Sequence, residues 1–161
     1  MQIKTLSKTE NIVKEMTVGF LLRGDEVLLG YKKRGYGVGK YSGVGGKLEK
    51  GETFDQCMIR ETLEEIKVNI RRLKKVGNIR IYDKTDIFGL HIYNIDEWSG
   101  TPQETEEIKP EWFKLDKIPF NRMWSDDSLW LRQTLNGAFV TGTIHHDEQG
   151  YINDLRFSKR M

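Results

Sequence analysis

Three glutamates of the sequence, Glu61, Glu64 and Glu65, stand at positions i, i+3 and i+4. On an α-helix these positions share one face. Each like-charged pair costs about 0.2–0.5 kcal/mol on an exposed helix, and Arg60 can neutralise one carboxylate at most. A divalent cation would offset the rest, and oxygen ligands favour Mg²⁺, with Mn²⁺ as an alternative. The spacing alone favours a solvated acidic face over a metal site, so the choice between these two interpretations depends on the surrounding sequence.

A helix over residues 53–67 is expected to carry these glutamates. Thr53 is suited to be its N-cap, and Gln56 follows three residues later in the pattern of a capping box. Apolar side chains recur along the segment near helical spacing. Directly upstream, residues 36–46 hold five glycines, which indicates a loop with special backbone requirements.

The rest of the chain has patterns typical of strands and turns. The predicted strands cover residues 16–22, 27–31, 76–82, 87–95 and 111–115, and a closing hairpin joins 138–145 to 151–157. A second helix is expected over residues 125–135. The fold class is therefore α+β, with mixed strands and two helices packed on them.

The composition is that of a water-soluble globular protein. The 161 residues fit one domain, 1–161, and 11% aromatic residues are too many for a disordered chain. A net charge of +2 gives no general attraction to nucleic acid or membrane, and no apolar run is long enough to span a bilayer. Residues 1–15 lack the apolar core of a signal peptide. We expect a cytoplasmic monomer, and the small basic excess is compatible with an anionic small ligand.

The acidic helix is preceded by a motif that changes its interpretation. The stretch from Gly46 to Val68 resembles the Nudix box, G-x5-E-x7-R-E-U-x-E-E-x-G-U, where U is aliphatic. The matching residues, at the required spacing, are Gly46, Glu52, Arg60, Glu61, Glu64, Glu65 and Val68. Thr62 and Lys67 depart from the pattern, the latter replacing the glycine that normally ends the helix. A match of this length is far more specific than a short motif.

Further segments resemble one branch of the Nudix family, the animal MutT homologues, which hydrolyse oxidised purine nucleoside triphosphates. The similar segments are residues 28–37, 43–47, 100–102, 112–113, 118–120 and 123–128. The resemblance implies an α/β/α sandwich around a mixed sheet, with the box forming a loop–helix–loop. It also implies Mg²⁺-dependent attack of water on phosphorus, which releases a nucleoside monophosphate and pyrophosphate and removes damaged nucleotides from the precursors of DNA.

The resemblance implies a metal site at the box. Its ligands would be Glu61, Glu64, Glu65, the carbonyl of Gly46 and the more distant Glu107, and one of the glutamates would act as base. Glu52 and Arg60 would form a supporting pair, and Lys47 and Lys32 would contact phosphate or sugar. Two alternatives stay open: Glu107 as an exposed loop acid, and Lys32 as one member of a solvated run of cations.

The base would be bound by Trp124, Asp126 and Asp127. A tryptophan face can stack on a purine, and two adjacent carboxyl groups can bind its Watson–Crick edge if one keeps a proton. The alternative is helix capping by Ser125 or Asp126. Ser42 replaces an asparagine of the animal enzymes, which puts the discrimination among oxidised purines in doubt. Three more residues match positions that line the pocket of the animal enzymes, namely Thr17, Ile81 and Phe88. The alternative for each is ordinary packing within the β-sheet.

Two other classes of function remain open. One is a Nudix hydrolase for ADP-ribose, a dinucleoside polyphosphate or capped RNA, and the other is a non-catalytic nucleotide sensor. Among the remaining polar residues, we expect Cys57 and His91 to be packed inside the fold. His145 and His146 are adjacent on a strand and must face opposite ways, which makes them a poor metal pair.

Overall fold

The computed structural model describes residues 12–159 of the chain. Most of residues 1–15, where we expect no signal peptide, therefore lies outside the described part. No helix among the described residues is long and apolar enough to cross a membrane.

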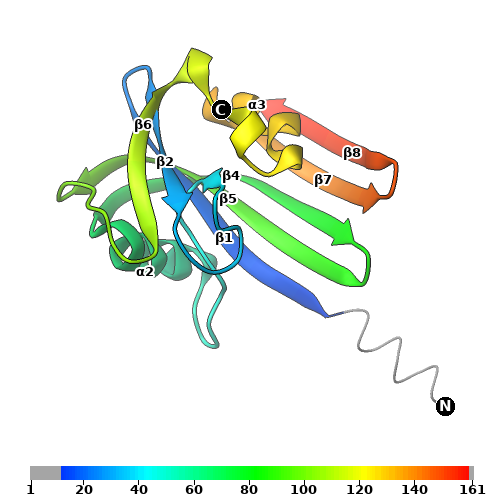
Figure 1. The fold of residues 1–161 in the computed structure, drawn as a ribbon, viewed down its shortest axis with the longest axis horizontal. Helices are drawn as coiled ribbons and strands as arrows, with labels where there is room; N and C mark the ends of the chain where they lie inside the picture. The colour runs from blue at the N-terminus through cyan, green and yellow to red at the C-terminus, as the bar shows by residue number, and fades with distance from the viewer. Residues whose placement is uncertain (1–11, 160–161) are drawn as a thin grey trace.

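A mixed sheet runs through the molecule (Figure 1). Its strands are β1 (Val13–Arg23), β2 (Glu26–Lys32), β3 (Tyr41–Ser42), β4 (Asn69–Asp83), β5 (Asp86–Ser99), β6 (Ile108–Lys114), β7 (Ala138–Asp147) and β8 (Gly150–Lys159). The order is β3-β2-β1-β5-β4-β7-β8, with β6 paired to β2. The pairs β1–β5 and β4–β7 are parallel, and the other pairs are antiparallel.

The two predicted hairpins, β1–β2 and β7–β8, are confirmed. Strands β1 and β2 join through a turn at Gly24, and β7 and β8 join beyond Asp147. Strands β4 and β5 are longer than predicted. Residues 69–75 carry four basic side chains and β4 contains register shifts there, so a simple alternation of apolar and polar residues is missing.

Helical segments cover the two faces of the sheet, which confirms the predicted sandwich (Figure 1). On one face, α2 (Phe54–Ile66) buries Met58 and Ile66 in a core that includes Leu21 and Tyr93. On the other face, Trp130 and Leu131 belong to a second core. The short helices there are η1 (Leu115–Lys117), η2 (Phe120–Arg122), η3 (Ser125–Leu129) and α3 (Leu131–Leu135).

The ends of α2 follow from the local sequence. The capping box is formed: the Thr53 hydroxyl accepts from the backbone N–H of Gln56, and the Gln56 side chain accepts from that of Thr53. At the other end Lys67 takes the left-handed conformation, with φ of 63°, in which glycine is most common at a helix end. A lysine can therefore end this helix, although its side chain adds strain.

The second helix is not continuous as predicted. Residues 125–135 divide into the 3₁₀ helix η3 and the five-residue α3, with Trp130 at φ of −139° between them. Trp124 stands at the N-cap of η3 and no side chain caps it. Capping by Ser125 or Asp126 is therefore wrong, and Asp126 and Asp127 are instead buried.

Candidate active site

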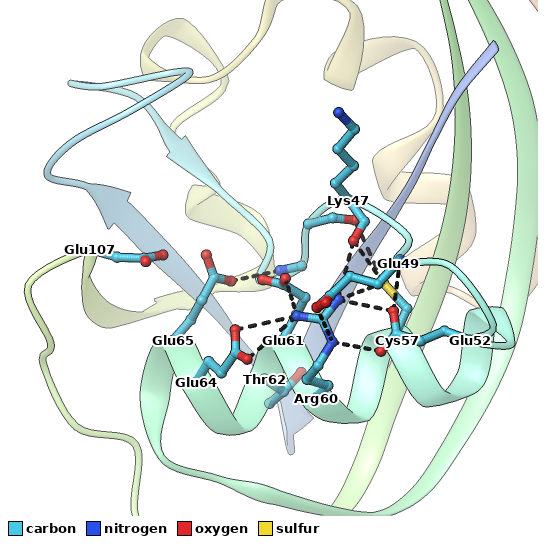
Figure 2. A network of polar contacts seen from close by, with 12 residues as sticks. Lys47, Glu49, Glu52, Cys57, Arg60, Glu61, Thr62, Glu64, Glu65 and Glu107 are labelled. Atoms are coloured by element: carbon cyan, nitrogen blue, oxygen red, sulfur yellow. Dashed lines mark hydrogen bonds and ion pairs between the residues drawn. The ribbon is translucent and has the colours of Figure 1, made fainter. Parts of the chain in front are cut away.

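Arg60 is the centre of a network that ties α2 to the loop before it (Figure 2). Its Nε and Nη2 atoms donate to the two carboxylate oxygens of Glu52 at 2.5 and 3.0 Å. Its Nη1 donates to Glu61 at 2.7 Å and lies 3.3 Å from Glu64, while Nη2 also donates to the Lys47 carbonyl at 3.2 Å. The hydrogen bonds from Arg60 lower the pKa of Glu52 to about 2. The predicted pair of Glu52 and Arg60 thus lies in direct contact.

Glu65 is the most buried of the three glutamates, with 2% of its side chain exposed. One carboxylate oxygen accepts from the backbone N–H of Gly45 at 2.8 Å, and the other lies 3.6 Å from Lys32 Nζ. Burial raises the pKa of Glu65 to about 7, although the Gly45 hydrogen bond and the Lys32 charge act in the opposite direction. The glycine-rich loop and β2 therefore both hold this carboxylate.

Glu61 lies directly against the backbone of Gly46. A Cβ atom at position 46 would lie 2.6 Å from the Glu61 carboxyl group, so a larger residue there would displace this carboxyl group. The Gly46 carbonyl accepts from the backbone N–H of Thr17 at 2.9 Å. Burial raises the pKa of Glu61, which Arg60 partly offsets. Glu64, by contrast, is largely exposed.

Glu107 and Lys47 take different positions relative to this cluster. Figure 2 shows the Glu107 carboxylate directed toward Glu65 from the loop before β6. Glu107 is partly exposed and pairs with Arg34 at 3.6 Å. The Lys47 side chain is exposed and extends away from the carboxylates, although its carbonyl contacts Arg60. The structure thus places Glu107 near the predicted metal ligands but leaves Lys47 outside them.

The carboxylates suit a divalent cation by chemistry, but Arg60 competes with such an ion for them. Within residues 12–159, no three acidic, histidine or cysteine side chains converge closely enough to form a metal site as they stand. The reason is visible in the contacts: Arg60 holds Glu61 and Glu64, and Gly45 holds Glu65. An all-oxygen donor set of this kind, with Glu65 buried and Glu61 half-buried, fits a hard cation such as Mg²⁺.

A cavity of about 620 Å³ begins at the acidic helix and extends to η3. Its volume is within the range of small-molecule sites. The predicted substrate residues, except Lys47, all line it, together with two of the predicted metal ligands: Thr17, Lys32, Ser42, Gly46, Glu65, Ile81, Phe88, Trp124, Asp126 and Asp127. The cavity therefore connects residues that lie far apart in the sequence.

Asp126 and Asp127 form the acidic end of this cavity, and both are less than 10% exposed. Burial raises the pKa of Asp126. The pKa of Asp127 is raised well above its usual value by burial and by the neighbouring charge of Asp126. Two adjacent carboxyl groups with raised pKa values favour a state that keeps a proton, so the pair can both donate and accept.

An aromatic stack borders the same end. The Tyr36 ring lies between Trp124 and Phe88, with centroid distances of 5.0 and 6.3 Å. Lys40 Nζ lies 5.2 Å from the Trp124 ring centre. These rings offer flat apolar surfaces on which a base can stack.

Several residues that line the cavity were not predicted from the sequence, namely Tyr36, Lys40, Asp83, His146 and Tyr151. Side chains alternate along β7, so one of its two adjacent histidines must face the cavity. The sequence therefore offered His145 and His146 as two alternative candidates. Nothing in the spacing indicated that Asp83 would lie beside His146, because β4 and β7 meet only in the folded sheet.

The residues expected to be packed are indeed away from the cavity. Cys57 and His91 are buried, and neither lines it. His91 lies between Glu15, at 3.2 Å, and Lys75, at 2.8 Å. His145 stacks on Tyr82 with a centroid distance of 4.5 Å.

Comparison with known proteins identifies the family. Residues 13–134 match the NUDIX domain family. The chain therefore belongs to the NUDIX family and is a Nudix hydrolase, a class that uses divalent metal ions. The predicted resemblance is confirmed.

Relatives with known names place the chain within the family. It is 44% identical to an oxidized purine nucleoside triphosphate hydrolase of Danio rerio over 119 residues. This aligned segment covers 73% of this chain and 76% of the relative. It is 40% identical over 146 residues to the enzyme of the same name from Mus musculus, with 89% and 92% covered. The crystal structure of a MutT protein from Bacillus halodurans has the same fold, with a TM-score of 0.73 and 22% identity over 90% of this chain and 97% of that one.

Proposed function

We propose that the protein hydrolyses oxidised purine nucleoside triphosphates, such as 8-oxo-dGTP, to the monophosphate and pyrophosphate. In this role it would remove damaged precursors of DNA from the cytoplasmic nucleotide pool. The observation that carries the proposal is the single cavity that joins Glu65 and Gly46 at one end to Asp126 and Asp127 at the other. The two similar enzymes of fish and mouse support the choice of substrate.

The acidic helix is the proposed site of phosphate chemistry. Glu61, Glu64 and Glu65 would hold Mg²⁺, or Mn²⁺ in its place, with the Gly46 carbonyl and Glu107 as further oxygen donors. When bound, the metal would neutralise phosphate charge and make a water molecule a better nucleophile, which is the chemistry that hydrolysis at phosphorus requires. Arg60 keeps the loop before α2 attached to the helix through its two hydrogen bonds to Glu52.

The opposite end of the cavity is the proposed site for the base. A protonated Asp127 would donate a hydrogen bond while Asp126 accepts one, so together they complement an edge that both accepts and donates. Trp124 would stack on the ring. Ser42 supplies a hydroxyl group from β3, and the apolar side chains of Ile81 and Phe88 complete the walls. Thr17 and Lys32 line the cavity at the acidic helix, where Thr17 contacts the Gly46 carbonyl and Lys32 faces Glu65.

A product screen tests the proposal: it measures pyrophosphate released from the triphosphates and the nucleotide products formed from every substrate. The substrates are 8-oxo-dGTP, 2-oxo-dATP, dGTP, ADP-ribose and diadenosine polyphosphates, each assayed with Mg²⁺ and with EDTA. We expect metal-dependent release from an oxidised purine triphosphate, and its loss in Glu64→Gln. Glu104→Gln is the matched control, because Glu104 pairs with Lys33 on the surface and does not line the cavity.

The remaining functions correspond to other outcomes of the screen. Faster cleavage of ADP-ribose or of a dinucleoside polyphosphate than of every triphosphate would identify a different Nudix substrate. Tight nucleotide binding without any turnover would identify a sensor. Full activity in Glu64→Gln would contradict the assignment of the metal site.

A further inference from the structure

The cavity has a second polar pair that the proposed function does not use. His146 is near the end of β7 and stands beside Asp83 of β4 in the parallel ladder. Its Nδ1 atom lies 3.0 Å from Asp83 Oδ1, and both residues line the cavity. Their side chains are just over one-third exposed, which leaves them open to a ligand.

The contact with Asp83 determines what His146 presents to the cavity. A carboxylate beside Nδ1 accepts a hydrogen bond from that nitrogen, so the neutral ring carries its hydrogen on Nδ1 and leaves Nε2 as an acceptor. Among the described residues, Nε2 of His146 has no hydrogen-bond partner. His146 therefore offers a free acceptor whose tautomer is set by Asp83.

Tyr151 holds this pair in a fixed relation to the aspartates. It is paired with His146 across the β7–β8 hairpin, and the two rings lie 4.6 Å apart. The hydroxyl of Tyr151 is hydrogen-bonded to that of Ser125, at 2.5 Å, directly before Asp126. The hairpin is thereby attached to the segment that carries the acidic pair.

The two polar pairs are close enough to influence each other. Burial is the main cause of the raised pKa of Asp126, and the nearby carboxylate of Asp83 raises it further. A planar base bound beside Asp126 therefore lies within reach of a second polar group. The hairpin that supplies His146 and Tyr151 lies beyond residues 13–134, the part that matches the family as a whole.

We propose that His146, positioned by Asp83, is a specificity-determining residue that accepts a hydrogen bond from a second edge of the base. This inference rests on the proposed function. The acceptor favours a purine with an N–H group on that edge. Guanine has an acceptor at N7, whereas oxidation at C8 places a hydrogen on N7. His146 thus attracts a purine oxidised at C8 and repels the undamaged base, in addition to any selection by Asp126 and Asp127.

The test compares kcat/KM for 8-oxo-dGTP, dGTP and 2-oxo-dATP, whose N7 carries no hydrogen. We expect His146→Leu to lose about 10-fold on 8-oxo-dGTP relative to 2-oxo-dATP, mainly through KM, as for the loss of one hydrogen bond. Asp83→Asn should shift the same ratio in the same direction. His146→Gln keeps an acceptor and should retain part of the preference. The matched control is His145→Leu, because His145 stacks on Tyr82 and does not line the cavity.

An unchanged ratio in a folded His146→Leu variant would overturn the inference, even if the wild type hydrolyses 8-oxo-dGTP rapidly. Thermal melting checks that each variant folds. Failure of the proposed function looks different, because the wild type would then release no pyrophosphate from any of the three triphosphates. In that case calorimetric titration with 8-oxo-dGMP and dGMP decides: equal affinities of the wild type for the two nucleotides would also overturn the role of His146.

Discussion

The carboxylate of Glu65 accepts a 2.8 Å hydrogen bond from the backbone N–H of Gly45. This contact joins the acidic face of α2 to the glycine-rich loop, and the same carboxylate faces Lys32 of β2. Because the loop also pairs with β1 through Thr17 and Gly46, the position of the predicted metal ligand depends on three separate elements. Changes in the loop should therefore affect both folding and catalysis.

Gly45→Ala should destabilise the fold and reduce activity. Gly45 has φ of 151°, and an added Cβ atom would overlap the backbone carbonyl of Thr17. We expect a loss of about 3 kcal/mol or more in the free energy of unfolding. Gly51→Ala is the control, since Gly51 also has positive φ but open space around it, and should cost about 1 kcal/mol. Urea unfolding measures both, and equal losses would contradict the proposed overlap.

Glu65→Gln should abolish activity yet stabilise the metal-free protein at high pH. The folded pKa of Glu65 is about 7, above the ordinary value near 4.3. Between these pH values the folded chain keeps a proton that the unfolded chain loses, so this group lowers stability as pH rises. Urea unfolding in EDTA should show the variant's advantage growing from pH 5 to pH 8. A constant difference would show that Glu65 titrates normally.

Glu52→Gln should lower the free energy of unfolding at neutral pH but not in acid. This pH dependence is opposite to that of Glu65, whose charge lowers stability as pH rises. The hydrogen bonds from Arg60 hold the pKa of Glu52 at about 2, so its contribution is fully present above about pH 4.3 and is lost as pH falls toward 2. The wild type and variant should differ at pH 7 and converge in acid. Glu49→Gln, which removes a longer and more exposed contact with Arg60, should have a smaller effect at pH 7. Equal effects would contradict the special role of Glu52.

The two aspartates should differ in their response to amide substitution. Asp127 has the more strongly raised pKa and is the expected proton carrier, so Asp127→Asn keeps a donor at that position. Asp126→Asn turns an acceptor partly into a donor. We expect kcat/KM for 8-oxo-dGTP to fall by about 10- to 100-fold in Asp126→Asn and by less in Asp127→Asn. The reverse order would place the proton on Asp126.

The local sequence predicted the acidic helix well and the second helix poorly. The capping box at Thr53 and the spacing of the Nudix box are local patterns, and both ends of α2 follow within one residue. The segment 125–135 has helical composition, but burial of Asp126 and Asp127 and the turn at Trp130 divide it. Packing against the sheet thus overrides the local preference.

The cavity could be predicted only where the family resemblance extended. Trp124 and the two aspartates lie in a segment similar to the animal enzymes, so their place in the cavity was anticipated. The pair of Asp83 and His146 depends on the parallel contact of β4 and β7, which are separated by more than 50 residues. Single-sequence patterns carry no information about such a contact, and the side of the strand that faces the cavity is set by the fold.

An internal competition tests the central claim most directly. Equal concentrations of 8-oxo-dGTP, dGTP and ADP-ribose are incubated with the protein and Mg²⁺, and the products are quantified by mass spectrometry over time. The early product ratios equal the ratios of kcat/KM. We predict that 8-oxo-dGMP accumulates at least about 10 times faster than dGMP, as one specific base contact allows, and that AMP from ADP-ribose stays a minor product. Equal rates for 8-oxo-dGMP and dGMP, or AMP as the main product, would contradict the proposed function.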